Sequence, residues 1–332
     1  MSVPVNLGDQ MRLPGLEAQV SLVESALRDA VRSDHAFLTE VAGHLISAGG
    51  KRVRPALVLG AAAAAGGQVD PAVVQGAVSV ELVHLGSLYH DDVIDEAESR
   101  RGAESVNHRW GNLVAILAGD FLLARASEIA ASLGTEVAGL LAHTIGRLCE
   151  GEVSQLTHAF DTARPETAYL SAIAGKTASL MATSARIGGI VGGADRPVVE
   201  ALTTYGQAFG MAFQIWDDIL DLVATEGQLG KPAGHDMVEG TYTLPVIRAL
   251  GDPEVGDELR ALLGAPLDDP TRDKARDLIA STSAVAASVV EARRWADLAY
   301  DALVPLRERG PVDVVDALSS FGHRLMEGLD RI

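Results

Sequence analysis

Two groups of aspartates carry the clearest chemistry in this sequence. They share one design, with three carboxylates at positions i, i+1 and i+4, and they lie well over a hundred residues apart in the chain. Their members are Asp91, Asp92 and Asp95 in the first cluster, and Asp217, Asp218 and Asp221 in the second. Residues four apart on a helix lie one above the other, so two carboxylates of each cluster repel each other and weaken the helix. This arrangement, present twice, predicts bound cations.

The hard cation Mg²⁺ suits these oxygen ligands best, because it keeps several waters and shares the phosphate oxygens of a substrate. Two clusters that face each other across a cleft would hold a diphosphate through bridging Mg²⁺. A single cluster of this type is more often a solvated stretch of helix surface. Here each cluster follows a long apolar segment, Val78–Tyr89 or Ala208–Trp216. The pattern therefore predicts an apolar pocket with a charged mouth.

The elements that must position these clusters are predicted to be helices throughout. Apolar residues recur every three to four positions, and alternation typical of strands is absent from the sequence pattern. The predicted helical segments are 16–46 (one or two helices), 55–65, 71 onward through the first cluster, 104–132, 135–158, 166–190, 197–223 and several short helices up to about residue 330. We expect a loop at 224–240, a frayed segment at 1–15 and a single domain over 1–332. The fold class is all-α, a large helical bundle around a deep central cleft.

Composition narrows the classes of partner and compartment. The chain has 332 residues, is 48% hydrophobic and carries a net charge of −18, which argues against nucleic acid as a partner. Cys149 is the only cysteine, so no intrachain disulfide is expected, in agreement with a reducing cytoplasm. The start of the chain lacks the pattern of a signal peptide, and no charge-free apolar run reaches about 20 residues, so we expect no membrane span and a cytoplasmic protein.

Cations stand at the predicted helix breaks of this acidic chain. They are Lys51, Arg54, Arg100, Arg101 and Lys231. Arginine binds phosphate with two parallel hydrogen bonds, and lysine acts as a point charge. Each one alone is more often an ordinary surface charge. Together they indicate a second anion site, separate from the diphosphate that the metal-bound carboxylates would hold.

With these residues in view, the chain resembles an all-trans isoprenyl diphosphate synthase, of the long-chain polyprenyl type. The stretches that carry the resemblance are GGKRVRP (49–55), ELVHLGSLYHDDVIDEAESRRG (81–102), LAGDFLLARA (117–126), GKTASL (175–180), FQIWDDILDL (213–222) and GKPAGHDMVEGTYTLP (230–245). They follow the order and spacing of that family over most of the chain. The resemblance implies the isoprenoid synthase fold, a homodimer, and isopentenyl diphosphate and an allylic diphosphate as the substrates.

The resemblance also implies a role for individual residues. The six aspartates would hold Mg²⁺, about three ions in each active site, on the allylic diphosphate. Other contacts to the allylic diphosphate would come from Arg100, Lys176 and Lys231, and isopentenyl diphosphate would be held by Lys51, Arg54, His84 and Arg101. Lys176, Thr177 and Gln214 would line the reacting centre. One departure concerns Thr241, which follows Glu239-Gly240 where similar synthases often have a lysine, so one contact to the allylic diphosphate is in doubt.

The reaction expected from this resemblance is chain elongation. The allylic C–O bond breaks to give a carbocation and pyrophosphate, and the double bond of isopentenyl diphosphate attacks that cation. No dedicated base stands out in the sequence, and the departing pyrophosphate is a reasonable proton acceptor. Because the product is again an allylic diphosphate, the cycle repeats. The primer, farnesyl or geranylgeranyl diphosphate, stays open, and the side chain of a quinone is a plausible end use.

Product length depends on the depth of the apolar pocket beside the helix that carries Asp91. Residues one and two turns before the first cluster would line it, namely Ser79, Val83, Gly86 and Ser87. Gly86 stands where short-chain relatives often have an aromatic residue, so we expect an open pocket and a product of about 35 to 50 carbons. Close packing against a neighbouring helix is the alternative explanation for Gly86, and Tyr89 is expected to point elsewhere.

Four alternatives stay open at this stage. A geranylgeranyl diphosphate synthase would share the chemistry but make a shorter product. A class I terpene cyclase would ionise one diphosphate, but it usually has a different second metal motif and does not need the second group of cations. A non-enzymatic subunit of a two-part synthase would be expected to have damaged aspartate clusters. A plain helical scaffold would leave the motifs unexplained.

Overall fold

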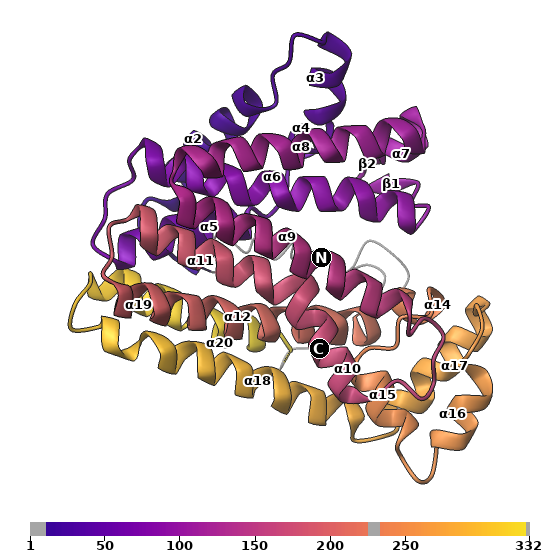
Figure 1. The fold of residues 1–332 in the computed structure, drawn as a ribbon. Helices are drawn as coiled ribbons and strands as arrows, with labels where there is room; N and C mark the ends of the chain where they lie inside the picture. Colours follow the sequence, from indigo (N-terminus) through magenta and orange to yellow (C-terminus); the bar gives the residue numbers. More distant parts are fainter. Residues whose placement is uncertain (1–10, 225–232, 330–332) are drawn as a thin grey trace.

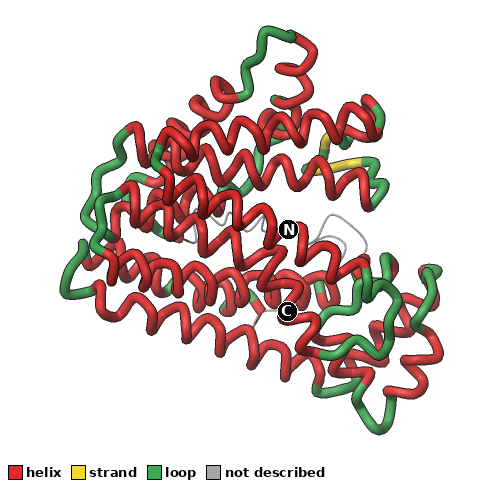
Figure 2. Tube along the Cα trace, in the orientation of Figure 1, coloured by secondary structure: helices red, strands yellow, loops and turns green. Residues whose placement is uncertain are grey.

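The structure is a computed structural model that describes residues 11–224 and 233–329. Helices dominate these residues, as Figures 1 and 2 show. The prediction of an all-α fold is confirmed. The two strands that the described residues contain, β1 (Ser99–Arg100) and β2 (Ala103–Glu104), form one short antiparallel hairpin, which the sequence pattern did not predict.

The N-terminal part of the chain leads into the helix that carries the first aspartate cluster. It consists of α2 (Leu16–Ala30), α3 (Ala36–Ala42), α4 (His44–Ser47), α5 (Val53–Ala64) and α6 (Pro71–Ile94). The start of α6 is set by Asp70, whose carboxylate accepts a hydrogen bond from the backbone N–H of Val73 at 2.9 Å, and by Pro71 in the first turn. The segment predicted as one or two helices at 16–46 is therefore three helices.

The middle of the chain carries the second cluster. Its helices are α7 (Val106–Trp110), α8 (Asn112–Ser132), α9 (Thr135–Leu156), α10 (Glu166–Ile173), the π-helical turn η1 (Ala174–Ala178), α11 (Ser179–Val191) and α12 (Arg196–Val223). Gly111, with φ of 89°, divides the predicted helix 104–132 into α7 and α8. The predicted helix 166–190 is interrupted by η1, because its backbone there widens into a π turn.

Short helices complete the fold after α12. They are α14 (His235–Val238), α15 (Leu244–Leu250), α16 (Gly256–Leu262), α17 (Asp269–Ala280), α18 (Ala284–Leu303), the 3₁₀ turn η2 (Val304–Leu306), α19 (Val312–Ser319) and α20 (Phe321–Met326). The loop predicted at 224–240 thus contains α14 in its described part. Helices α14 to α17 surround a smaller apolar cluster that includes Met237, Tyr242 and Leu259.

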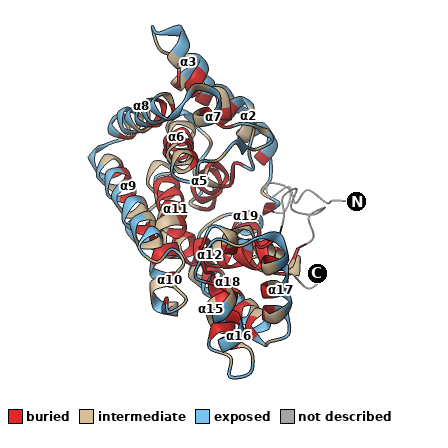
Figure 3. Ribbon diagram, turned by 90° about the vertical axis from the view of Figure 1, so that its right-hand side faces the viewer, coloured by how far each residue is buried: buried red, intermediate tan, exposed pale blue. Residues whose placement is uncertain are grey.

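The core lies along α5, α6, α11 and α12, which are mostly buried in Figure 3, whereas α8 and α9 expose one side. Among the described residues, α6 is the single helix whose length and composition would suit a membrane span. Of its most apolar 18-residue window, 67% is buried inside the fold. Since the core helix of a soluble protein passes the same test, this finding is weak evidence for a membrane span.

Candidate active site

The first aspartate cluster lies at the C-terminal end of α6, and its three side chains have different surroundings. Asp91 is half-buried, Asp92 is 0% exposed and Asp95, the C-cap residue, is exposed. Asp92 Oδ1 accepts hydrogen bonds from Arg100, which lies 2.6 Å away through Nε. Asp92 Oδ2 is buried, and no described residue makes a hydrogen bond to it. The first and third carboxylates are therefore the accessible pair.

The β1–β2 hairpin directs two neighbouring arginines to different places. Ser99 pairs with Glu104 and Arg100 with Ala103, and Arg101 turns the chain with φ of 55°. Arg100 reaches back to Asp92, whereas Arg101 donates to the carbonyl oxygen of Gly49 and lies 3.5 Å from His84 Nε2. The hairpin thus connects the aspartate cluster to the loop between α4 and α5.

The second cluster lies near the C-terminal end of α12, and its central aspartate is again turned inward. Asp217 is exposed, whereas Asp218 and Asp221 are 5% and 7% exposed. Asp218 accepts hydrogen bonds from the Tyr169 hydroxyl at 2.5 Å and from Gln214 Nε2 at 2.7 Å. Asp221 Oδ2 accepts one from the backbone N–H of Asp236 at 3.2 Å.

The π turn η1 connects the surroundings of the two clusters. Lys176 Nζ lies 2.6 Å from Glu152 on α9, and its charge acts on Asp91 and Asp95 of the first cluster. The next residue, Thr177, donates a hydrogen bond to Gln214 Oε1 at 2.6 Å, one helical turn before Asp218. Residues predicted for one site from distant parts of the sequence are therefore brought together on this turn.

Two glycines let neighbouring helices approach the π turn closely. A Cβ on Gly151 of α9 would lie 2.5 Å from the backbone nitrogen of Lys176. A Cβ on Gly210 of α12 would lie 2.5 Å from Cα of Ala178. Only glycine fits at such separations, because real side chains do not approach backbone atoms so closely. The turn is thereby wedged between α9 and α12, and this fixes the positions of Lys176 and Thr177.

Burial shifts the pKa values of the ionisable groups around this turn. Burial, with the neighbouring charges of Glu152 and Asp95, raises the pKa of Asp91 to about 6 despite the opposing charge of Lys176. Burial likewise raises the pKa of Asp218 to about 7, against the hydrogen bonds from Tyr169 and Gln214. For Lys176, burial lowers the pKa, but the carboxylates of Glu152 and Asp91 outweigh it and the pKa is raised.

The donors of the first cluster fit a hard divalent cation. Asp91 and Asp95 supply carboxylate oxygens at the i and i+4 positions. Burial is the largest cause of the raised pKa of Asp91, and repulsion from the Asp95 carboxylate raises it further. A cation at this place would relieve that repulsion. Over the described ranges 11–224 and 233–329, no three Asp, Glu, His or Cys side chains converge closely enough to hold an ion by themselves. Any ion must therefore take further ligands from water or a substrate.

Arginine charges surround His84 on α6, two helical turns before the first aspartate cluster. Lys51 is exposed, and Arg54 is half-buried with its Nε buried and without a hydrogen-bond partner in the described part of the chain. Burial, with the charge of Arg101, lowers the pKa of Arg54 to about 10. Burial and then the charges of Arg54 and Arg101 lower the pKa of His84, so the imidazole is neutral near pH 7. Such a concentration of positive charge suits a polyanion.

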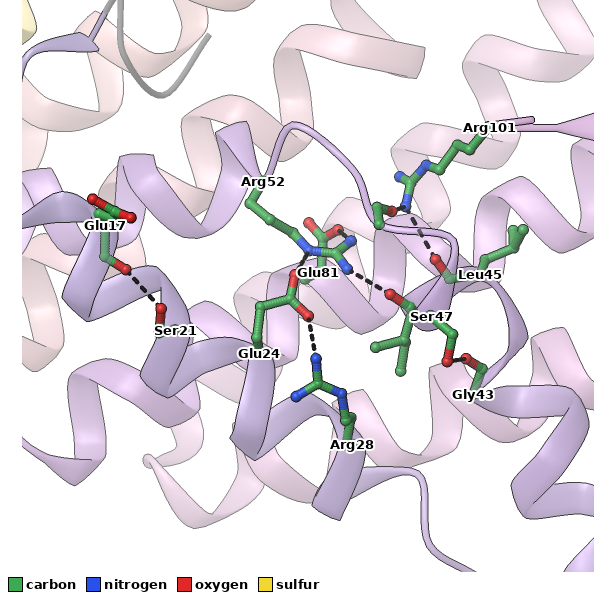
Figure 4. A network of polar contacts seen from close by, with 12 residues as sticks. Glu17, Ser21, Glu24, Arg28, Gly43, Leu45, Ser47, Arg52, Glu81 and Arg101 are labelled. Atoms are coloured by element: carbon green, nitrogen blue, oxygen red, sulfur yellow. Dashed lines mark hydrogen bonds and ion pairs between the residues drawn. The ribbon is translucent and has the colours of Figure 1, made fainter. Parts of the chain in front are cut away.

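Figure 4 shows the contacts of Arg52, which lies between Lys51 in the loop before α5 and Arg54 in the first turn of α5. It is the N-cap of α5, with a left-handed φ of 46°, and its side chain is 3% exposed. Its Nε donates to Glu24 Oε1 at 2.5 Å, and Nη1 donates to Glu81 Oε1 at 2.7 Å. A third bond joins Nη2 to the carbonyl oxygen of Ile46. Arg52 and Glu81 lie within the stretches that carry the family resemblance, but no role was predicted for either residue.

Two further residues of the site were missed entirely. Glu152 pairs with Lys176, and Tyr169 binds Asp218 from 49 residues away. Neither belongs to a recognisable motif, and only a map of distant contacts would have found them. Lys231 lies outside the described residues. Thr241 lies 3.5 Å from Gln155 Nε2, in the turn after α14.

The residues predicted to line the pocket lie on α6 and are partly or fully buried. Ser79 and Val83 are 0% exposed, and Ser87 donates a hydrogen bond to the carbonyl oxygen of His84. A Cβ on Gly86 would lie 3.1 Å from the carbonyl oxygen of Gly119 and 3.1 Å from Leu123 Cγ, both on α8. Close helix packing, the alternative explanation, therefore accounts for Gly86. Tyr89 donates to the carbonyl oxygen of Val41 at 2.7 Å and so points toward α3.

Comparisons with known proteins agree on one family. The family model for polyprenyl synthetases matches residues 35–280. The chain is 41% identical over 297 residues to the heptaprenyl diphosphate synthase component 2 of Geobacillus stearothermophilus, in an alignment that covers 88% of this chain and 92% of that protein. It is 42% identical over 269 residues to the nonaprenyl diphosphate synthase of Mycobacterium tuberculosis, in an alignment that covers 80% of this chain and 79% of that protein.

Solved structures of similar proteins have the same fold. A decaprenyl diphosphate synthase from Rhodobacter capsulatus aligns with a TM-score of 0.87 and 35% identity, over 97% of this chain and 99% of that chain. A polyprenyl synthase from Caulobacter crescentus, in complex with calcium and isoprenyl diphosphate, aligns with a TM-score of 0.87 and 34% identity, over 96% and 97%.

Proposed function

The chain belongs to the polyprenyl synthetase family, and we propose that it makes long-chain all-trans polyprenyl diphosphates. It is a prenyltransferase that adds isopentenyl units to an allylic diphosphate primer, farnesyl or geranylgeranyl diphosphate. The observation that carries the proposal is the pairing of two distinct anion sites, one at the aspartates around η1 and one at the cations around His84. A transferase with two diphosphate substrates needs both.

The residues of the first site suit the allylic diphosphate. The family is metal-dependent, and we assign Mg²⁺ to Asp91 and Asp95 with Asp217 opposite, because Asp92 and Asp218 are engaged by Arg100 and Tyr169. When bound, the ions would neutralise charge on the leaving diphosphate. As the resemblance implies, each active site would bind about three ions.

The chain's own cations complete the stabilisation of the leaving group. Lys176 is held beside Asp91 by its ion pair with Glu152, and Arg100 is held by Asp92, so both have fixed positions before substrate binds. Groups whose positions are already fixed need no reorganisation as the allylic C–O bond breaks, which makes their electrostatic effect larger. Glu152 therefore acts as a positioning residue for Lys176.

The residues of the second site suit isopentenyl diphosphate. Arg54 and Arg101 crowd a neutral His84, and a bound diphosphate would relieve their mutual repulsion. The neutral imidazole can donate one hydrogen bond without adding charge. Holding both substrates in place turns an encounter between two molecules into a reaction within one complex. The double bond then attacks the allylic cation, and the departing pyrophosphate is positioned to accept the proton that is lost.

The nearest alternative is a shorter product, such as geranylgeranyl diphosphate. The close approach of Leu123 to Gly86 favours this shorter product. Glycine has no side chain, but α8 fills the space beside it that a longer product would need. A long product then requires that the growing chain pass beside Leu123 rather than through the position of Gly86. A terpene cyclase is disfavoured, since it has no use for the cations around His84.

A product assay tests the function. Purified protein is incubated with Mg²⁺, farnesyl diphosphate and labelled isopentenyl diphosphate, and product length is read by mass spectrometry. A ladder that ends at about 35 to 50 carbons supports the proposal. A product of about 20 carbons supports the alternative, and release of pyrophosphate without incorporation of isopentenyl units would indicate a cyclase. Complete inactivity would point to a missing partner subunit.

We also propose a cytoplasmic homodimer of single-domain subunits. Apolar side chains on the outer side of α8 support the dimer, with Leu113 71% exposed, Ile116 41% and Leu117 57%. Sedimentation equilibrium at several protein concentrations would measure the mass. A monomer at every concentration would contradict this part of the proposal.

A further inference from the structure

Four side chains form one hydrogen-bonded row beside the second aspartate cluster. Tyr169 of α10 donates to Asp218 Oδ2 at 2.5 Å, and Gln214 Nε2 donates to Asp218 Oδ1 at 2.7 Å. The carbonyl oxygen of the Gln214 side chain accepts from the Thr177 hydroxyl at 2.6 Å. The row thus runs from a buried tyrosine to the hydroxyl expected at the reacting centre.

Buried groups surround Asp218 at the centre of this row. Tyr169 is 2% exposed, and Arg164, which is 4% exposed, places its guanidinium 5.7 Å from the centre of the tyrosine ring. The charge of Arg164 also acts on Asp218. Asp218 is 5% exposed and each of its oxygens accepts a hydrogen bond, which leaves a metal ion little access to it.

The geometry of the row gives each of its hydrogen bonds one direction. The Tyr169 hydroxyl and the NH₂ group of the Gln214 side chain both donate to Asp218. The amide of Gln214 therefore turns its NH₂ group toward Asp218 and its carbonyl oxygen toward Thr177. Because that carbonyl only accepts, the Thr177 hydroxyl must donate its proton to it.

This direction decides which part of Thr177 faces its other neighbours. With its proton engaged by Gln214, the Thr177 oxygen presents lone pairs, which stabilise an allylic cation. If the amide of Gln214 were flipped, its NH₂ group would donate to Thr177, and the hydroxyl proton would turn outward. That proton would destabilise the same cation. The two amide orientations thus have opposite electrostatic effects at the reacting centre.

We propose that Tyr169 and Asp218 are positioning residues for prenyl transfer, which hold the Gln214 amide so that Thr177 presents lone pairs to the allylic cation. The inference rests on the proposed function and assigns Asp218 a role other than metal binding. The proposal requires that removal of the Tyr169 hydroxyl slow the chemical step, and that the size of this effect depend on Thr177.

The test is a double-mutant cycle on the full-length protein. Tyr169→Phe is expected to lower kcat by roughly 10- to 100-fold, the effect of leaving a buried acceptor without its donor, with KM for both diphosphates within about twofold of wild type. In a Thr177→Val background the same change should lower kcat by less than about threefold, because coupled residues are not additive. Tyr205→Phe is the matched control, since Tyr205 is equally buried and donates to the carbonyl oxygen of Leu318 at 3.0 Å, away from the row.

Two results would overturn the inference. Equal losses of kcat from Tyr169→Phe in both backgrounds would mean a structural role only. For Asp218→Asn, we expect a lower kcat with an unchanged Mg²⁺ concentration for half-maximal rate, and a large rise in that concentration with kcat restored at saturating Mg²⁺ would make Asp218 a metal ligand. Failure of the wild-type protein to incorporate isopentenyl units would instead refute the proposed function, so the two failures are distinguishable.

Discussion

Removing Glu81 should destabilise the protein far more than removing an exposed partner in the same network. Glu81 and Arg52 are 2% and 3% exposed in their side chains, and Arg52 Nη1 lies 2.7 Å from Glu81 Oε1. Glu81→Gln would leave the buried guanidinium with one carboxylate, Glu24, whose side chain is 22% exposed. Breaking a buried ion pair typically costs about 3 to 5 kcal/mol, because one charge stays buried without its partner. Since Glu24 remains, we expect about 3 kcal/mol for this variant.

The chain supplies a matched control. Arg28 pairs with the same Glu24 at 3.7 Å, but its side chain is 62% exposed. An exposed pair of this kind contributes at most about 1 kcal/mol, so Arg28→Ala should fall below that value. The double variant Arg52→Met with Glu81→Leu removes both buried charges and should lie much closer to wild type than Glu81→Gln alone.

The assay is urea denaturation followed by circular dichroism, at one fixed protein concentration, with KM for isopentenyl diphosphate measured on the same samples. Because Arg52 fixes the start of α5 between Lys51 and Arg54, Glu81→Gln should raise that KM more than it lowers kcat. A free energy of unfolding within about 1 kcal/mol of wild type, equal to that of Arg28→Ala, would refute the reasoning from burial. An unchanged KM would refute the link between Arg52 and the substrate loop.

Three further outcomes are expected. Asp91→Ala should abolish Mg²⁺-dependent turnover with helix content by circular dichroism nearly unchanged, and activity at the wild-type level would exclude Asp91 from the metal site. His84 has a pKa below its usual 6.5 in the folded state, so the unfolded chain binds the proton more readily. The contribution of His84 to stability is therefore complete above about pH 6.5 and is lost as pH falls. This loss of stability should be smaller in His84→Gln, and identical profiles of stability against pH would contradict the prediction. Gly86→Ala should lower stability by about 1 kcal/mol, since its new Cβ meets the backbone of α8, whereas Gly139→Ala, with nothing within 4 Å, should raise it by up to about 1 kcal/mol; thermal unfolding of both would settle the comparison, and equal effects would contradict the packing role of Gly86.

Much of the fold follows from local patterns in the chain. The cap residues Asp70 and Asp195 with their neighbouring prolines mark the starts of α6 and α12, and those helices end beside the predicted clusters. Local patterns were less informative where tertiary contacts override them. The π turn at 174–178 exists where α9 and α12 press on it through Gly151 and Gly210, and no periodicity of the sequence reveals that contact.

The amino-acid sequence alone determined the family, the helical architecture and the polar residues from which a site would be built. These properties depend on residue type and on spacing along the chain, which helix periodicity converts into faces. Only the tertiary structure decided which aspartates are accessible. Asp92 is held by Arg100 from a hairpin, and Asp218 is held by Tyr169 from another helix. Side-chain direction is set by the partners a residue meets, and those partners lie far away in sequence, so spacing alone cannot supply them.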